Sequence, residues 1–433
     1  MKTDVIIIGG GAAGMTAAIF AAREGRKVCV IEHRSEPGKK LLQTGNGKCN
    51  LTHEDVCAGD YLNPGRCSGR GAQAFGREDI LSGFLGKAFQ VFGYRETIIF
   101  FESIGIPVRN KGGYIYPYSG TALSVRNALW DEMKRLGVMI MTDTEPEISF
   151  EKGIFKALTV TKKKADGKEY TEKKEITCEK LILATGLKAA PGTGSDGSGI
   201  EIAKGLGLKI NRVLPALVKL KCSDGLCKPA SGVRHICRST MYADGEEAFK
   251  ETGEVQFTDD GISGIPVFNM SRFASAALDD GGSVIAILDL LPDYSIEECY
   301  DFIDKNYESM KDRKLISFFG GLLPGKLLTA AARSISLSSE KKVSETGADQ
   351  MKELIGVCKG WKLEVLQAHG FEAAQVCSGG VDISDIDPST MEVKKFPGLY
   401  VAGELADVDG PCGGFNLLWA WTSGAIAGEN TFA

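Results

Sequence analysis

Histidine, clustered basic charge and long apolar runs are all scarce in this sequence. The four histidines have no metal-ligand spacing, so we expect no metal site. A formal net charge of -5 argues against nucleic acid as the main partner, because phosphate binding needs a clustered basic surface. No apolar run approaches the ~18 residues that a membrane span needs. These absences favour a protein that acts on a small molecule, with no nucleic acid or membrane partner.

Paired cysteine motifs are also missing. The 12 cysteines form no CxxC, and the closest pair, Cys222 and Cys227, is separated by four residues. The first residues, MKTDVIIIGG, enter a strand directly and lack the layout of a signal peptide. We therefore expect a cytoplasmic protein with reduced thiols.

The clearest motif is Gly9-x-Gly11-x-x-Gly14. It follows an apolar strand at residues 4–8 and opens a helix, and Glu32 ends the next strand 18 residues after Gly14. In a dinucleotide-binding βαβ unit, the first glycine allows the tight turn, the second lets a pyrophosphate approach, and the third lets helix and strand pack. Glu32 would bind ribose hydroxyls. The helix N-terminus, with Ala12 and Ala13, would face the pyrophosphate.

A long glycine-rich loop at residues 34–60 follows this unit. Long ordered loops tend to be functional, and a larger cofactor half would run there, which favours FAD over NAD. Cys49 has no partner at the spacing of a dithiol relay, so we expect it to be packed rather than nucleophilic. The loop residues expected at the cofactor are Lys39, Lys40, Asn46, Gly47 and Cys49.

Two later strands end in similar loops. KLILATG, at 180–186, would return the chain to the FAD domain, and GLYVAGE, at 398–404, precedes a glycine-rich loop and a last apolar helix. Glu404 could accept a hydrogen bond from a ribityl hydroxyl, and Asn416 could be the N-cap of the helix. The alternative is a packing helix without a ligand. The expected cofactor residues are Ala184, Thr185, Gly186, Gly403, Glu404, Asp409, Gly413, Gly414, Phe415, Asn416 and Leu417.

Together these stretches resemble the BaiN/RdsA family of NAD(P)/FAD-dependent oxidoreductases, also described as aminoacetone-oxidase-family FAD-binding enzymes. The resemblance is strongest in GKKLLQTGNGKCNLT and in GELADVDGPCGGFNLLWAWTSGAIAG. It implies an α/β fold of the two-dinucleotide type, with a split FAD-binding Rossmann domain at 1–193 and 365–433. The inserted region, 194–364, would be β-rich to about 292 and helical from about 293.

Three other patterns are ambiguous. Gly192 to Gly197 also fits GxGxxG and could open a separate NADPH domain, but no acidic strand end follows, which favours a loop on the flavin side.

Gly320-x4-Gly325-Lys326 resembles a phosphate loop, but Leu327 replaces the Ser/Thr that ligates Mg²⁺, which favours a structural turn. Tyr114, Tyr116 and Tyr118 could supply a phenol as proton donor or could simply pack.

The expected activity is reduction of an enone-type C=C bond, as in a 3-oxo bile acid or steroid, with hydride passing from NAD(P)H through FAD. The nicotinamide would bind transiently, because no complete second Rossmann unit is visible. One alternative is a flavin-dependent oxidase of a small amine that uses O₂. Another is a regulatory or RNA-modification partner, which the acidic balance disfavours. The sequence identifies neither a catalytic acid nor an oligomeric state.

Overall fold

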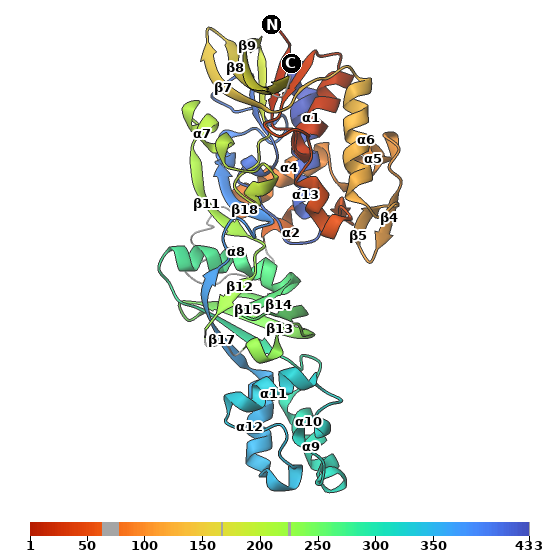
Figure 1. The fold of residues 1–433 in the computed structure, drawn as a ribbon, viewed down its shortest axis with the longest axis vertical. Helices are drawn as coiled ribbons and strands as arrows, with labels where there is room; N and C mark the ends of the chain where they lie inside the picture. Colours follow the sequence, from red (N-terminus) through yellow and green to blue (C-terminus); the bar gives the residue numbers. More distant parts are fainter. Residues whose placement is uncertain (63–77, 166–167, 224–226, 433) are drawn as a thin grey trace. The chain divides into compact units, whose positions relative to one another are not determined.

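The computed structural model describes residues 1–62, 78–165, 168–223 and 227–432. These residues fall into two compact units (Figure 1). Unit 1 holds residues 1–62, 78–214 and 374–432, and unit 2 holds 215–223 and 227–373. Unit 1 thus contains both ends of the chain, while the domain boundaries at 193 and 365 stay a prediction.

A parallel sheet of five strands is the centre of unit 1. Its strands are short, and β1, β2, β10 and β19 are almost fully buried, which is why they are continuous apolar runs, whereas the edge strand β6 is partly exposed. Apolar runs of the sequence predict all five strands with slightly wider bounds, at 4–8, 27–32, 138–142, 180–186 and 398–404. In spatial order they are β19 (Leu399–Val401), β10 (Lys180–Leu183), β1 (Val5–Ile8), β2 (Val28–Ile31) and β6 (Met139–Met141). The strand order reverses between β1 and β10, and ligands of such sheets bind at the carboxyl ends beside this point.

The first and last long helices pack against each other on this sheet. Figure 1 shows α1 (Ala12–Arg23) and α13 (Phe415–Glu429) within unit 1. A Cβ added at Gly424 would lie 2.4 Å from the Ala13 carbonyl oxygen, and one at Gly428 would lie 2.5 Å from that of Ala17. Only glycine permits this approach. The other helices of unit 1 are α2 (Ala58–Leu62), α4 (Glu78–Val91), α5 (Tyr94–Ser103), α6 (Ala122–Arg135) and α7 (Ser198–Gly205).

Three small sheets complete unit 1. The alternating pattern of residues 147–186 predicts an antiparallel meander, and the basic run KKK at 162–164 predicts a solvated hairpin within it. Both predictions are confirmed: the strands are antiparallel, and Lys162 and Lys163 pair with glutamates. The turn expected at 166–167 lies outside the described residues. The sheets are β3-β5-β4 (Thr52–His53, Tyr114–Pro117, Val108–Lys111), β7-β8-β9 (Thr144–Glu151, Ile154–Ala165, Lys168–Cys178) and β11-β18 (Ile210–Ala216, Val376–Val381).

Unit 2 combines a closed barrel with a group of helices, in agreement with the predicted β-rich part, to about residue 292, and the predicted helical part after it. The barrel order is β12 (Leu220–Cys222), β15 (Gly261–Gly264), β14 (Glu246–Phe257), β13 (Arg234–Ala243), β16 (Val284–Asp289) and β17 (Trp361–Ala368). The helices are α8 (Ile265–Asp279), α9 (Ile296–Met310), α10 (Leu315–Phe318), α11 (Gly325–Ser334) and α12 (Ala348–Lys359).

Two local predictions in unit 2 are confirmed. The stretch from Ser295 to Glu298 predicts a capping box that opens a helix to about Lys311, and Ser295 does cap α9, with Glu298 completing the box. The phosphate-loop lookalike is a turn before α11, and the Lys326 Nζ donates to the Ser231 carbonyl at 3.2 Å. Across the described ranges, no helix combines the length and apolarity needed to cross a membrane.

Candidate cofactor site

The glycine loop after β1 has the geometry that its motif predicts. Gly9 has a φ of 99°, and a Cβ at Gly14 would lie 1.9 Å from the Gly9 carbonyl oxygen. A Cβ at Gly11 would meet nothing within 4 Å. Gly11 is also the N-cap of α1, without a side-chain cap and without an acidic residue in the first turn. Open space therefore lies beside a helix N-terminus that favours an anion.

Glu32 lies directly beside this loop. One carboxylate oxygen accepts from the Gly10 N–H and the other from the Arg34 N–H, both at 2.8 Å. Each oxygen has a second lone pair, so the carboxylate can still accept a hydrogen bond from a ligand hydroxyl. The two backbone bonds fix the carboxylate at the carboxyl end of β2, where a ribose would lie.

The second glycine motif, residues 192–197, lies against the same end of the sheet. Arg34 donates to the Pro191 carbonyl at 3.0 Å, and the His33 ring lies 3.8 Å from the Asp196 carboxylate. Strand β11, which follows α7, pairs with β18 and does not extend the parallel sheet. This arrangement agrees with a loop on the flavin side and gives no support to a separate NADPH domain starting here.

The turn after β10 closes on the first loop. A Cβ at Gly9 would lie 2.6 Å from the Ala184 carbonyl oxygen, so the two strand ends touch. A Cβ at Gly199 would lie 1.7 Å from the Thr185 hydroxyl, and Gly186 has a φ of 68°. The Ala-Thr-Gly turn therefore joins the fingerprint loop to the start of α7.

The long loop and the last strand meet through an ion pair. The Lys40 Nζ lies 2.7 Å from one Glu404 oxygen, and the other oxygen accepts from the Cys377 N–H at 2.9 Å. Both charged side chains are mostly buried, with 26% and 18% exposed. Sequence analysis predicts separate cofactor contacts for Lys40 and Glu404, and it missed their pairing because 364 positions separate them.

The tip of the long loop turns through left-handed backbone. Asn46, Gly47 and Cys49 have φ values of 54°, 79° and 55°, and Lys39 lies half-buried at the start of the loop. Cys49 is fully buried, and this burial raises the pKa of its thiol to about 12. A thiol that stays protonated at neutral pH is no nucleophile, so Cys49 is packed, as predicted.

The prediction that Asn416 caps α13 is wrong. The N-cap is Gly414, because Gly413 and Gly414 have φ values of 129° and 102° that start the helix earlier. The Asn416 side chain instead accepts from the Gly410 N–H and donates to the Gly410 carbonyl, both at 2.8 Å. It therefore closes the loop in front of the helix, while Leu417 lies in the first turn.

An aromatic group and a buried amide lie at the start of α13. His53 stacks on Phe415 with ring centroids 5.6 Å apart and meets the Tyr114 ring edge-on at 5.0 Å. Asn50 is buried, and its Oδ1 has no hydrogen-bond partner in the described part of the chain. A Cβ at Gly414 would lie 3.0 Å from this oxygen. Asn50 lies within the GKKLLQTGNGKCNLT stretch that carries the family resemblance, but its sequence pattern did not single it out as a cofactor contact, and His53 lies just beyond that stretch.

These features fit FAD. The glycine loop after β1 provides an anion site, and Glu32 provides an acceptor for ribose hydroxyls. At the start of α13, the Asn50 Oδ1 is an acceptor without a partner in the described residues, beside the backbone of Gly414, and it suits the N–H-bearing edge of a flavin. All predicted site residues belong to unit 1. Asp409 is buried there, and Gly403 is held by its own N–H to the Ser423 hydroxyl and by the Trp419 indole N–H to its carbonyl.

Comparison with known proteins agrees with this geometry. The family model described as "HI0933-like protein Rossmann domain" matches residues 3–430. The chain is 36% identical over 429 residues to the 3-dehydro-bile acid Δ(4,6)-reductase of Clostridium scindens, covering 98% of this chain and 97% of the relative. It is 28% identical to the ribosomal RNA dihydrouridine synthase of Escherichia coli, covering 100% and 98%.

Among solved structures, the chain resembles the 3-ketosteroid-Δ4-(5α)-dehydrogenase of Rhodococcus jostii. The TM-score is 0.50 at 17% identity, with 100% of this chain and 97% of that one covered. This likeness concerns the fold alone. The fold and the full-length sequence relationships lead to one assignment: the chain is an FAD-dependent oxidoreductase that belongs to the HI0933-like Rossmann family, as the resemblance to the BaiN/RdsA group implied.

Proposed function

We propose that this protein reduces a carbon–carbon double bond conjugated to the ketone of a 3-oxo steroid or bile acid, with NAD(P)H as the electron donor. The observation that carries the proposal is the 36% identity to a bile acid Δ(4,6)-reductase over nearly the whole of both chains. The match covers 98% of this chain and 97% of the relative, so neither protein lacks a domain that the other has.

The described residues have distinct parts in this proposal. The N-terminus of α1, with Gly11, Ala12 and Ala13, would hold the pyrophosphate, and Glu32 would hold the adenosine ribose. The Lys40–Glu404 pair would contact the ribityl chain, and Asn50 and the start of α13 would hold the flavin edge. Bound FAD supplies hydride transfer between the nicotinamide and the substrate. The protein positions the reactants, and the proposed substrate needs no thiol chemistry, in keeping with the inert Cys49.

Reduction of a uracil base is the second candidate. It is favoured by the relatives described as ribosomal RNA dihydrouridine synthases, at 28% identity in Escherichia coli and 26% in Haemophilus influenzae. Formation of dihydrouridine also saturates a double bond conjugated to a carbonyl, so one flavin site could serve either substrate. The net charge of -5 disfavours an RNA substrate, because RNA binding gains most of its affinity from cationic side chains.

Anaerobic reduction of the purified flavoprotein separates these activities. We expect NADH or NADPH to bleach the flavin absorbance, and a 3-oxo-4-ene or 4,6-diene steroid to restore it, with one C=C bond reduced for each flavin reoxidised. Recovery of the absorbance by a uridine-containing ribosomal RNA fragment, but by no steroid, would favour the second candidate. Bleaching by a small amine without any nicotinamide would contradict both and point to the oxidase.

A further inference from the structure

Strand β5 presents two tyrosines on one face. Tyr114 and Tyr116 alternate with buried Ile115 and Pro117, as a strand requires. The Tyr116 ring Cε1 lies 3.7 Å from the Cβ position of Gly45, in the long loop after β2. The Tyr114 ring Cε1 lies 2.9 Å from the Cβ position of Gly413, in the loop before α13. The two phenols therefore lie against the two loops expected to flank the flavin.

The surroundings of Tyr116 keep its phenol protonated. The side chain is half-buried, and this desolvation, together with the nearby Tyr114 and Cys412, raises the pKa of Tyr116 above its usual value of 10. At neutral pH the hydroxyl is therefore a proton donor and never a base. An enolate is a far stronger base than a phenolate, so transfer of the proton from the hydroxyl to an enolate carbon is downhill.

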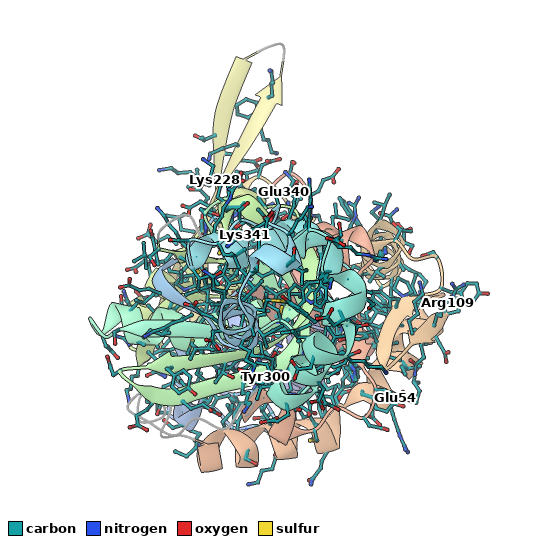
Figure 2. All side chains as sticks on the ribbon, turned by 90° about the horizontal axis from the view of Figure 1, so that it is seen from below. Glu54, Arg109, Lys228, Tyr300, Glu340 and Lys341 are labelled. Carbon is teal, nitrogen blue, oxygen red and sulfur yellow. The ribbon has the colours of Figure 1, made fainter. Side chains whose placement is uncertain are left out.

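Tyr118 lies in a different environment. It is 61% exposed, and the Arg109 guanidinium lies over its ring, 4.1 Å from the centroid. Figure 2 shows Arg109 projecting outward from strand β4. Tyr118 therefore belongs to the solvated rim of the small sheet, which makes it a matched control for the two inner tyrosines.

We propose that the Tyr116 hydroxyl donates the proton that completes reduction of the C=C bond. This inference rests on the proposed enone reduction. Hydride reaches the β-carbon, and the electron pair of the double bond passes to the ketone as an enolate. The O–H bond of Tyr116 then breaks as a C–H bond forms at the α-carbon. The phenolate left behind regains its proton from water, and NAD(P)H is the overall reductant.

Other candidate donors in the same region fit this step less well. The Cys49 thiol is fully buried and held against Thr44, so no substrate can touch it. The His53 ring is stacked on Phe415, and its Nδ1 lies 3.0 Å from the Glu54 carbonyl, which ties the ring to the backbone. Tyr114 packs edge-on against His53 and closely against Gly413, so its ring has a packing role between these two residues.

The test is a Tyr116→Phe variant of the full chain, with Tyr118→Phe as control and Tyr114→Phe as comparison. Stopped-flow absorbance measures the two half-reactions separately. We expect the same FAD content and the same rate of flavin reduction by NAD(P)H in all four proteins. Reoxidation by the enone should slow about 100-fold or more in Tyr116→Phe alone, the usual size of general acid catalysis.

A second readout does not depend on turnover. In an ultraviolet pH titration of tyrosinate absorbance, one phenol that titrates above pH 10 should disappear in Tyr116→Phe and persist in Tyr118→Phe. The reoxidation rate of the wild type should fall only above that pH. A Tyr116→Phe protein that is reoxidised at the wild-type rate overturns the inference alone. A wild type that is reoxidised by no enone overturns the proposed function, and the inference with it.

Discussion

At the scale of single residues, the carboxylates of this site have structural as well as binding roles. Glu32 holds the backbone N–H groups of Gly10 and Arg34, and Glu404 holds Lys40 and the Cys377 N–H. The motif in the sequence located Glu32 and Glu404 correctly at two strand ends. It could not reveal their partners, because hydrogen bonds to backbone groups and to distant lysines leave no sequence pattern. The misassigned cap at Asn416 has the same origin: the backbone conformation of Gly413 and Gly414 decides where the helix begins.

Glu132 allows a prediction about stability and pH. Its carboxylate accepts from Arg23 of α1 at 2.9 Å and from Arg135 at 2.6 Å, and these bonds lower the pKa of Glu132 to about 2. Because the folded-state pKa lies below the unfolded value near 4.5, the stabilisation is complete above pH ~4.5 and is lost as the pH falls toward 2. We expect Glu132→Gln to lower stability by about 1–2 kcal/mol at pH 7.

Thermal unfolding followed by circular dichroism, at pH 7 and again near pH 3, measures this effect. The difference between wild type and Glu132→Gln should shrink at the lower pH. The control is Glu102→Gln, at an exposed position of α5, which should change little at either pH. An equal loss of stability at both pH values would show that packing, rather than charge, is what the substitution removes.

At the scale of elements, the sequence predicted all five parallel strands and helices that match α4, α5, α6, α9, α11 and α12, but it missed others. Apolar runs bounded by glycine located all five parallel strands. Helix α8 was missed, because it is buried on nearly all sides and so lacks the polar stripe that marks an amphipathic helix. Helix α7 was missed because it follows a glycine motif that reads as a loop. Gly424 and Gly428 mark the face of α13 that packs on α1, but glycines indicate such a contact only when the partner helix is known.

The contact between α1 and α13 gives the second prediction. A Gly424→Ala methyl group would lie 2.4 Å from the Ala13 carbonyl oxygen, so the helices must separate just behind the fingerprint loop. We expect a loss of about 1–3 kcal/mol, measured as earlier release of flavin fluorescence on heating. Gly83→Ala in α4, where a Cβ meets nothing within 4 Å, should instead stabilise its helix by about 0.5–1 kcal/mol. Equal behaviour of the two variants would contradict the close packing.

At the scale of the whole molecule, the cofactor unit should be separable from the rest of the chain. Strands β11 and β18, which flank the excursion into unit 2, are paired, and a Cβ at Gly379 would lie 2.0 Å from the Arg212 carbonyl oxygen. Removing residues 215–373 would therefore leave one chain end on β11, shortened by two residues, and the other two residues before its neighbour β18. We expect a protein with a short Gly/Ser linker in their place to fold, to bind FAD and to reduce no substrate.

Flavin fluorescence quenching and far-ultraviolet circular dichroism would check this prediction. As a control, the same linker could replace residues 95–110, which include most of α5 and part of β4 within unit 1, and it should abolish folding. A linker protein that is folded but binds no FAD would mean that unit 2 supplies cofactor contacts. An unfolded one would mean that the two units form a single cooperative structure.

The position of β19 also sets the timing of folding during synthesis. Its neighbour β10 is complete about 200 residues earlier in the chain. At about 5–20 residues per second, the ribosome takes about 10–40 s to make that stretch. Throughout this interval β10 is an apolar edge strand with no neighbour on one side. The face of α1 that later packs against Gly424 and Gly428 of α13 is also exposed. Exposed apolar edges of this kind promote aggregation. We therefore expect a chaperone to bind the half-built sheet of the nascent chain until its last strand emerges.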